Sequence, residues 1–486
     1  MNHFDVIIIG AGLSGIGAAC HLSRSQPHKT FSILESRHAM GGTWDLFRYP
    51  GIRSDSDMHT LGYSFKPWRD KKAIADGTAI REYIQQTAAE YDLAKHIQYQ
   101  CRVVAAAWDS STANWTLTIE RTGSDNKTVQ EKLSCNFIYS CTGYYRYDKG
   151  YTPDFPGAEQ FKGQIIHPQQ WPEDLDYSGK RVVVIGSGAT AITLVPSMAK
   201  TAAHVTMLQR SPTYVISRPE IDTLSRALGK ILPEKLAYGL TRWKNVSLQA
   251  LMFQMSRRFP KLVKRLLRKS ARDWLGKDFD VDTHFNPRYN PWDQRLCLVP
   301  NGDLFRSLRQ GTSTVVTDHI EHFTESGIRL KSGDVLEADI IVSATGLELL
   351  VFGGMQLTVD SQPVVIPETV GYKGMMFSDV PNLALAAGYT NASWTLKCDL
   401  TSEYVCRLLA YMDRHNYQYC VAKFNDPQMQ RIPFLDLASG YVDRAIDELP
   451  KQGSKAPWRL YQNYLLDILN LRAGSVRDKA MKFYRL

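Results

Sequence analysis

The sequence predicts an α/β fold in which two similar domains are joined and the second carries a helical insertion. Each domain has a buried strand that leads directly into a glycine-rich turn and a helix. The glycines of the first turn are Gly10, Gly12 and Gly15, and those of the second are Gly186 and Gly188. Each domain also ends a buried strand in Thr-Gly, at 142–143 and at 345–346. This repeated pattern is typical of two Rossmann-like dinucleotide-binding domains.

The boundaries of these domains follow from the positions of the two units. We expect the first domain to comprise residues 1–143 and 381–486, and the second to comprise 151–215 and 293–380. Residues 144–160, rich in Tyr, Gly, Pro and Asp, are predicted to link the domains. Residues 216–292 break the α/β alternation and predict a helical insertion, with helices at 222–232, 234–257 and 260–275. Asp222 suits a helix cap, and Pro233 and Pro260 suit first-turn positions.

The first unit indicates a dinucleotide without a 2′-phosphate. Small residues at the turn let backbone N–H groups approach a pyrophosphate, and the helix N-terminus favours negative charge. Glu35 ends the next strand, about 20 residues after the glycines, where an acid suits a ribose hydroxyl. FAD or NAD therefore fits this unit better than NADP.

The second unit differs at the corresponding position. Ala191 opens its helix after Gly186 and Gly188, and its second strand ends before Arg210 and Ser211. An arginine at this place can bind a 2′-phosphate, which favours NADPH over NADH. The alternative is a surface arginine without a ligand.

Two further segments resemble motifs of type I Baeyer–Villiger monooxygenases, which are class B flavoprotein monooxygenases. One is the loop 41–55, with two glycines, aromatic residues and a Pro-Gly turn. The other follows the spacing F-x-G-x-x-x-H-x-x-x-W-P, formed by Phe161, Gly163, His167, Trp171 and Pro172. The segment 284–305 is similar to that of the ethionamide-activating type of this family. His167 alternatively only hydrogen-bonds backbone in a linker.

The resemblance implies FAD in the first domain, NADPH in the second, and O₂ with a small hydrophobic ketone or sulfide as substrates. It further implies conversion of ketones to esters or lactones through a C4a-peroxyflavin, with oxidation of sulfides or thioamides as well. Its implied catalytic residues are Arg295 and Asp55, with Arg288 as the rival arginine. Its implied cofactor-binding residues also include Gly42, Thr43, Trp44, Thr345 and Gly346. We expect Trp394 and Asn391 to line the substrate pocket.

Composition and net charge restrict the cellular compartment and the partners that we expect for this protein. The eight cysteines include no C-x-x-C pair, which predicts reduced thiols, a cytoplasmic protein and no metal site. The net charge of +9 suits an anionic cofactor or surface, and no nucleic-acid motif accompanies it. Basic and apolar residues alternate over 257–272, which predicts either peripheral membrane association or packing of the insertion on its own enzyme. The sequence predicts no oligomeric state.

Two other functions remain open at this point. One is a flavin-containing monooxygenase that oxygenates nitrogen or sulfur, although its fingerprint usually lacks a residue such as Trp171. The other is a non-catalytic membrane-surface protein on the same fold, which the basic segment 257–272 suggests. Intact glycines in both turns argue against the second alternative.

Overall fold

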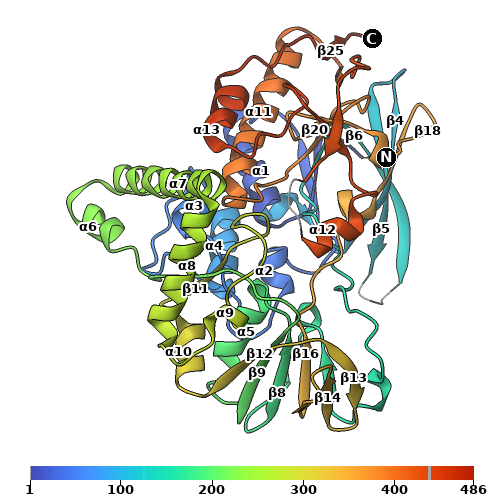
Figure 1. The fold of residues 1–486 in the computed structure, drawn as a ribbon. Helices are drawn as coiled ribbons and strands as arrows, with labels where there is room; N and C mark the ends of the chain where they lie inside the picture. Colours follow the sequence, from blue (N-terminus) through green and yellow to red (C-terminus); the bar gives the residue numbers. More distant parts are fainter. Residues whose placement is uncertain (1, 124, 126, 436–438) are drawn as a thin grey trace.

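The first domain is built on a nine-stranded sheet (Figure 1). The computed structural model describes the chain except for residues 1, 124, 126 and 436–438. The strands of this sheet are β1 (His3–Ile9), β2 (Phe31–Leu34), β3 (Ile97–Gln98), β4 (Cys101–Asp109), β5 (Asn114–Thr122), β6 (Thr128–Ser140), β17 (Gln356–Val359), β18 (Gln362–Pro363) and β21 (Leu383–Leu385). Strands β1, β2, β3 and β21 run parallel to one another and to β6, whereas β4 and β5 form an antiparallel excursion.

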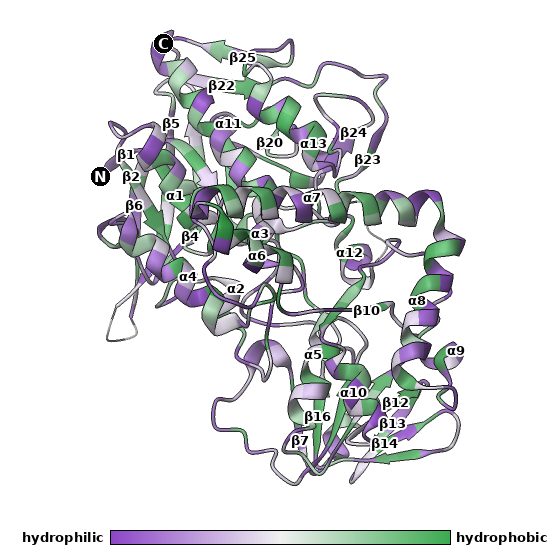
Figure 2. Cartoon of the chain, turned by 90° about the vertical axis from the view of Figure 1, so that its left-hand side faces the viewer, coloured by the Kyte–Doolittle hydropathy of each residue, from purple (hydrophilic) through white to green (hydrophobic). Residues whose placement is uncertain are grey.

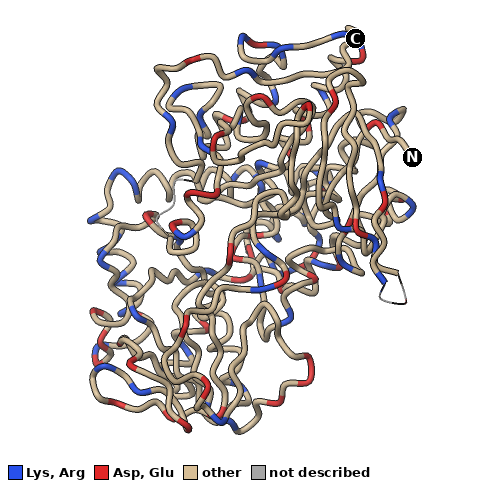
Figure 3. Tube along the Cα trace, turned by 90° about the vertical axis from the view of Figure 1, so that its right-hand side faces the viewer, with Lys and Arg blue, Asp and Glu red and all other residues tan. Residues whose placement is uncertain are grey.

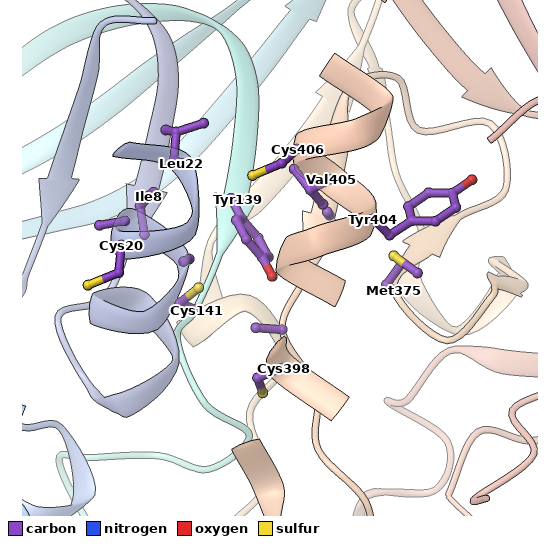
Figure 4. Packing of buried hydrophobic residues seen from close by; sticks show 14 of the residues in the cluster. Ile8, Cys20, Leu22, Tyr139, Cys141, Met375, Cys398, Tyr404, Val405 and Cys406 are labelled. Atoms are coloured by element: carbon purple, nitrogen blue, oxygen red, sulfur yellow. The ribbon is translucent and has the colours of Figure 1, made fainter. Parts of the chain in front are cut away.

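Helices cover the parallel part of this sheet. They are α1 (Leu13–Ser25), α2 (Thr43–Leu46), α3 (Met58–Leu61), α4 (Gly77–Glu90) and α11 (Trp394–Arg414). Figure 4 shows α1 and α11 on either side of Tyr139 of β6, with Cys406 of α11 pointing into the space between them. The hydroxyl of Tyr139 lies 2.9 Å from that of Ser402. Strand β1 and helix α1 both contribute buried side chains to this core. Because burial of apolar surface is favourable, it stabilises the glycine turn that connects β1 to α1.

The second domain has a fully parallel five-stranded sheet of order β12-β9-β8-β16-β7. Its strands are β7 (Gln164–Ile166), β8 (Arg181–Ile185), β9 (His204–Gln209), β12 (Ser313–Thr317) and β16 (Ile340–Ser343). The runs VVVI of β8 and IIV of β16 are apolar and buried because both faces of a parallel sheet are covered. Helices α5 (Ala189–Met198) and α10 (Asp303–Arg309) belong to this domain, as does the antiparallel ribbon β13 (Ile320–Thr324), β14 (Gly327–Leu330) and β15 (Val335–Glu337). The predicted α/β fold is confirmed.

The helical insertion bridges the two domains. It contains α6 (Thr223–Ile231), α7 (Glu234–Arg258), α8 (Pro260–Leu275) and α9 (Val281–His284), so the three long predicted helices are confirmed. Its ends meet where β10 (Val215–Arg218) pairs with β11 (Cys297–Pro300). Helix α7 packs on α3 of the first domain, whereas α8 packs on α10 and β10 of the second. In the described part of the chain, no helix is both long and apolar enough to cross a membrane.

The structure corrects the boundary at residue 380. Residues 356–363 pair with the first sheet through β17 and β4, and Leu357 is buried in the first domain's core beside Trp108. Residues 371–377 (β19, Gly371–Tyr372, and β20, Met376–Phe377) also pack on that core. The chain therefore returns to the first domain soon after Gly346, because the apolar residues of these strands complete its core.

The C-terminal segment 457–486 is mostly non-helical. Only α13 (Tyr464–Asp467) and a short π-helix (Ile468–Ala473) are helical there. Gly474 follows that π-helix with an extended backbone, and β25 (Met481–Tyr484) pairs with β22 (Tyr419–Ala422). Between β22 and this segment lie β23 (Arg431–Pro433), α12 (Gly440–Ala445) and β24 (Lys451–Gly453).

Candidate active site

The first glycine turn has no room for side chains. A Cβ at Gly10, whose φ is +104°, would lie 2.6 Å from the carbonyl oxygen of Cys141, and one at Gly15 would lie 1.8 Å from that of Gly10. At Gly12 a Cβ would lie 3.4 Å from the Cα of Gly42. The end of β6, the turn and the loop 41–55 are thus in close contact, and the N-terminus of α1 faces the same region.

Glu35 lies beside this turn. Its Oε2 accepts the N–H of Ala11 at 2.7 Å, and its Oε1 accepts the N–H of Arg37 at 2.8 Å. Burial raises the pKa of the Glu35 carboxyl, and these backbone hydrogen bonds oppose the shift. The predicted ribose-binding acid and the predicted pyrophosphate-binding turn are therefore adjacent.

The second turn repeats this geometry. Gly186 has φ +134°, and a Cβ there would lie 2.4 Å from the carbonyl oxygen of Ala344 at the end of β16, as Gly10 meets the end of β6. Gly188 is exposed, and a Cβ there would meet no atom of the described chain within 4 Å. Ala191 is buried inside α5. The turn is thus closed toward the sheet and open on its outer side, as a pyrophosphate site requires.

The remaining predicted residues of the second domain surround this turn. Arg210 and Ser211 are exposed at the end of β9, and the Ser187 hydroxyl donates to the Ser211 carbonyl oxygen at 3.2 Å. The Thr345 hydroxyl donates to the carbonyl oxygen of Tyr151 at 2.7 Å, so the Thr-Gly ending holds the interdomain linker.

The loop 41–55 connects the two domains. Gly42 faces Gly12, and the hydroxyl of Thr43 lies 2.6 Å from that of Tyr145. At its other end, a Cβ on Gly51 would lie 1.8 Å from the Ser197 hydroxyl oxygen of α5. The loop therefore runs from the first turn to a helix of the second domain.

A cavity of about 280 Å³ lies where these parts meet. It is lined by both turn regions, including Gly12, Ser14, Ala189 and Thr190, and by Gly42, Thr43, Trp44, Asp55, Arg295 and Trp394. One space thus contacts both predicted dinucleotide sites. This arrangement lets two cofactors exchange a hydride.

Arg295 and Asp55 form an ion pair in the wall of this cavity. The Nε atom of Arg295 lies 3.1 Å from Oδ2 of Asp55, and both side chains are partly exposed to the cavity. The negative charge of Asp55 raises the pKa of Arg295 further above its usual range, against the effect of burial. Arg295 is therefore a permanent cation. Arg288 lies on the same loop but is exposed and does not line this cavity.

The nearby thiol is not a nucleophile. Burial raises the pKa of Cys297 to about 12, so the thiol is protonated at neutral pH. All eight cysteines are buried and free.

The fingerprint residues do not line this cavity and contact other parts of the second domain. Nδ1 of His167 accepts the N–H of Gln169 at 3.1 Å, so Nε2 carries the proton and donates to the Gly346 carbonyl oxygen at 3.2 Å. Burial lowers the pKa of His167, which keeps its ring neutral. The other members are a buried Phe161, Gly163 against the Asp339 carbonyl oxygen, Trp171 edge-on to Tyr177, and Pro172.

Of the predicted pocket residues, Trp394 begins α11 and Asn391 lies on the loop before it. The Trp394 indole N–H donates to the Ser14 hydroxyl at 2.9 Å, and its ring stacks on Tyr144 at 5.1 Å. Asn391 lines a neighbouring cavity of about 550 Å³, which also reaches Arg295 and Asp55.

Sequence reasoning missed several residues that shape the site. Tyr144 was assigned to a linker, although aromatic residues directly after the first Thr-Gly ending indicate a wall beside the turn. Gln462 and Asp467 hold the loop 388–397 from the C-terminal segment. No local pattern marks them, because their partners are distant in the sequence.

Two dinucleotide-type turns, one lining the cavity and the other leading into the helix that lines it, are typical, with a fixed cation beside them, of a two-cofactor oxidoreductase of the flavoprotein type. Residues 3–361 match the family described as FMO-like, flavin-binding monooxygenase-like. The chain belongs to this family, so it is a flavin-binding monooxygenase that uses O₂ and an organic substrate. The resemblance inferred from the motifs is confirmed at this level.

Curated relatives match over nearly the whole chain. The FAD-containing monooxygenase EthA of Mycobacterium tuberculosis is 53% identical over 483 residues, which cover 99% of this chain and 98% of EthA. The probable FAD-binding monooxygenase AlmA of Acinetobacter baylyi is 51% identical over 484 residues, covering 99% of this chain and 96% of AlmA.

Solved structures share the fold. Oxidized steroid monooxygenase bound to NADP aligns over the whole of both chains with a TM-score of 0.79 and 20% identity. Open cyclohexanone monooxygenase also aligns over both whole chains, with a TM-score of 0.74 and 18% identity. These identities are low, and the likeness concerns architecture.

Proposed function

We propose that the protein is an NADPH-dependent Baeyer–Villiger monooxygenase that holds FAD in its first domain. It converts a ketone, O₂, NADPH and a proton to an ester or lactone, NADP⁺ and water. The observation that carries this proposal is the cavity lined by the first glycine turn, by the start of α5 directly after the second turn, and by the Arg295–Asp55 ion pair. The names of the relatives and of the structural neighbours, which contain FAD or NADP, support the choice of cofactors.

The residues present suit these cofactors. Gly10, Gly12 and Gly15 let the first turn pack closely between the end of β6 and the loop 41–55, so that the N-terminus of α1 can take a pyrophosphate with the Glu35 carboxylate beside the turn. Gly188 leaves the second turn open in the same way, and the exposed Arg210 suits a 2′-phosphate. When bound, the flavin supplies oxygen activation and the nicotinamide supplies the hydride.

Arg295 stabilises negative charge on the oxygen atoms that react in the cavity, first on the attacking oxygen and then on the former ketone oxygen. Asp55 orients the guanidinium through Nε. The stacked rings of Trp394 and Tyr144 form an apolar wall that limits access of water to these charges.

The test is oxygen incorporation by purified, FAD-loaded protein with NADPH and ¹⁸O₂, against a panel of ketones. We expect a yellow protein and an ester that carries one labelled oxygen atom. A protein that binds FAD but consumes no O₂ with NADPH, or that forms no ester from any ketone, would contradict the proposal.

A second candidate is oxygenation of a sulfide or thioamide in the same cavity. A sulfur atom accepts oxygen without rearrangement, so the same residues serve both reactions. Ketones and thioethers in one panel separate the candidates, because a flavin-containing N/S-monooxygenase forms sulfoxide from the thioethers but no ester from the ketones. Trp171 in the fingerprint favours ketone oxidation.

We also propose a cytoplasmic protein that associates peripherally with membranes. Eight free cysteines support a reducing compartment, and the basic, partly apolar surface of α8 supports an anionic membrane surface. Cell fractionation tests this location. The protein should pellet with membranes and be released by about 0.5 M salt, because salt screens surface charge.

A further inference from the structure

The insertion presents an unusually apolar outer surface. Of the nineteen large hydrophobic side chains on the described surface, ten lie within 223–275. They include Ile231, which is 80% exposed, and Leu236, Leu240, Trp243 and Leu251 along one side of α7. Figure 2 faces this side of the molecule, with α7 across the front and apolar segments along it. Patches of this kind mark an interface.

Basic residues alternate with the apolar ones on α8. Lys261, Leu262, Arg265, Leu266 and Lys269 are exposed and recur at the spacing of one helix face. The side that packs on the protein is a different one, formed by Val263, Leu267 and Ala271. Therefore only some of the apolar residues of α8 pack on the enzyme, and the others remain exposed. Lys and Arg recur along this edge of the molecule (Figure 3).

Acidic residues do not cancel this charge. Lys261 and Arg265 have no ion-pair partner in the described chain. Of the other exposed cations on this face, Lys269 is paired with Asp273 at 2.6 Å, so the uncompensated charge is that of Lys261 and Arg265. The surface thus combines exposed apolar side chains with uncompensated positive charge, which complements an anionic lipid surface.

Buried hydrogen bonds anchor the insertion to the first domain, so its outer surface does not fold back over the protein as a lid. Arg242 of α7 is buried and donates to the carbonyl oxygens of His59 and Gly62 at 2.8 and 2.7 Å. It also pairs with Asp399 at 3.3 Å, and the Tyr238 hydroxyl donates to the Tyr63 carbonyl oxygen. These bonds anchor the inner side of α7 to the first domain.

A cavity opens at the same surface. Asn245, Leu248, Gln249 and Met252 of α7 form one wall of the 550 Å³ cavity whose inner end includes Arg295. Leu248 is also 45% exposed, so it belongs both to this wall and to the outer patch. The route to the candidate active site therefore begins at the apolar patch.

We propose that the outer surface of α6, α7 and α8 docks on an anionic lipid bilayer and that the cavity beneath α7 receives its substrate from that bilayer. The substrates would then be apolar molecules that partition into lipid. This second part rests on the proposed oxygenation, whereas docking itself does not.

The test uses the full-length, FAD-loaded protein and sedimentation with lipid vesicles. We expect binding to phosphatidylcholine vesicles that contain about 30% phosphatidylserine and weak binding to pure phosphatidylcholine, because basic residues are attracted to anionic lipid. The variant K261E/R265E should bind the acidic vesicles about 30-fold less tightly, which is roughly fivefold for each cation removed. K132E/K331E makes the same charge change at exposed positions outside the insertion and should bind like the wild type.

Failure of docking is distinguishable from failure of the oxygenation. K261E/R265E should oxidise a water-soluble ketone at the wild-type rate but oxidise a vesicle-dissolved ketone more slowly. If the wild type binds acidic vesicles and oxidises no ketone, docking stands and the proposed function falls. If the wild type does not bind acidic vesicles, or if both variants lose binding equally, the docking proposal is wrong. Ultracentrifugation of L262S/L266S tests whether the patch is instead an interface between two copies of the chain. If this variant is a monomer where the wild type is a dimer, and the wild type does not bind vesicles, the docking proposal is wrong.

Discussion

The Nε atom of Arg295 lies 3.1 Å from Oδ2 of Asp55, and the two residues, far apart in the sequence, meet in the wall of the cavity. Asp55 belongs to the loop that leaves the first glycine turn, and Arg295 to the loop that ends the insertion. Their ion pair therefore forms only when both domains and the insertion are correctly placed, which links the fold directly to the proposed chemistry.

Arg295→Ala should uncouple the two halves of the reaction. Without the cation, charge on the reacting oxygen loses its stabiliser, and oxygen transfer should slow about 10²–10³-fold. NADPH oxidation should continue, so ester formation and NADPH consumption must be measured together. Arg288→Ala is the matched control, because that side chain is exposed on the same loop and should leave both rates unchanged. Normal ester yield from Arg295→Ala would remove this residue from the mechanism.

Asp55→Asn should act through Arg295. The amide keeps the shape of the side chain but removes the charge that holds the guanidinium, so we expect a smaller loss of ester formation than for Arg295→Ala. The double variant should be no worse than Arg295→Ala alone, because interacting residues are not additive. Independent, multiplying losses of kcat in this cycle would show that Asp55 acts separately from Arg295.

Arg210→Ala tests the choice of nicotinamide. Loss of an exposed arginine beside the second turn should raise KM for NADPH about 10-fold or more and leave KM for NADH unchanged, since only NADPH has the 2′-phosphate. Lys200→Ala, which removes an exposed cation just after α5, is the control. Equal increases in KM for both nucleotides would argue against a 2′-phosphate contact.

Local sequence patterns were sufficient to predict the two glycine turns and the helices of the insertion. The Asp222 carboxylate does accept the Ser225 N–H at the start of α6, and Pro260 begins α8, as the residue types indicated. The choice between Arg295 and Arg288 could not be made locally, because both residues lie on one loop and differ only in what packs around them. The same limit hid the contacts of Gln462 and Asp467 and the return of 356–363 to the first sheet.

His167 should make stability depend on pH. Burial lowers the pKa of His167 in the folded protein, whereas the unfolded chain protonates its imidazole near pH 6.5. Below that pH the unfolded state binds more protons, so the free energy of unfolding falls as pH decreases. His167→Gln keeps a donor for the Gly346 carbonyl oxygen but does not titrate, and its thermal midpoint should fall less between pH 7 and pH 5 than that of the wild type. His319→Gln, at an exposed position, is the control. If the thermal midpoints of the wild type and His167→Gln fell equally between pH 7 and pH 5, His167 would not be neutral and buried in the folded protein.

Asp467 should position the loop that lines the cavities. Its Oδ2 accepts from Lys397 Nζ at 2.7 Å and from the Tyr389 hydroxyl at 2.7 Å, and both ends of the ion pair are buried. Asp467→Asn leaves the Lys397 ammonium uncompensated, which costs about 3–5 kcal/mol. We expect a lower thermal midpoint and a raised KM for ketone, because Thr390 and Asn391 follow Tyr389 in the cavity wall.

Two comparisons separate positioning of the loop from general loosening of the C-terminal segment. Arg472→Ala removes the half-exposed ion pair with Glu403, which joins the same segment to α11, and should cost only about 0–1 kcal/mol with an unchanged KM. The double variant Lys397→Met/Asp467→Leu removes both buried charges and should recover most of the stability. Because it does not restore the bond to Tyr389, its KM for ketone should remain raised. A KM that returns to the wild-type value in this variant would show that Asp467 stabilises the fold without positioning the loop.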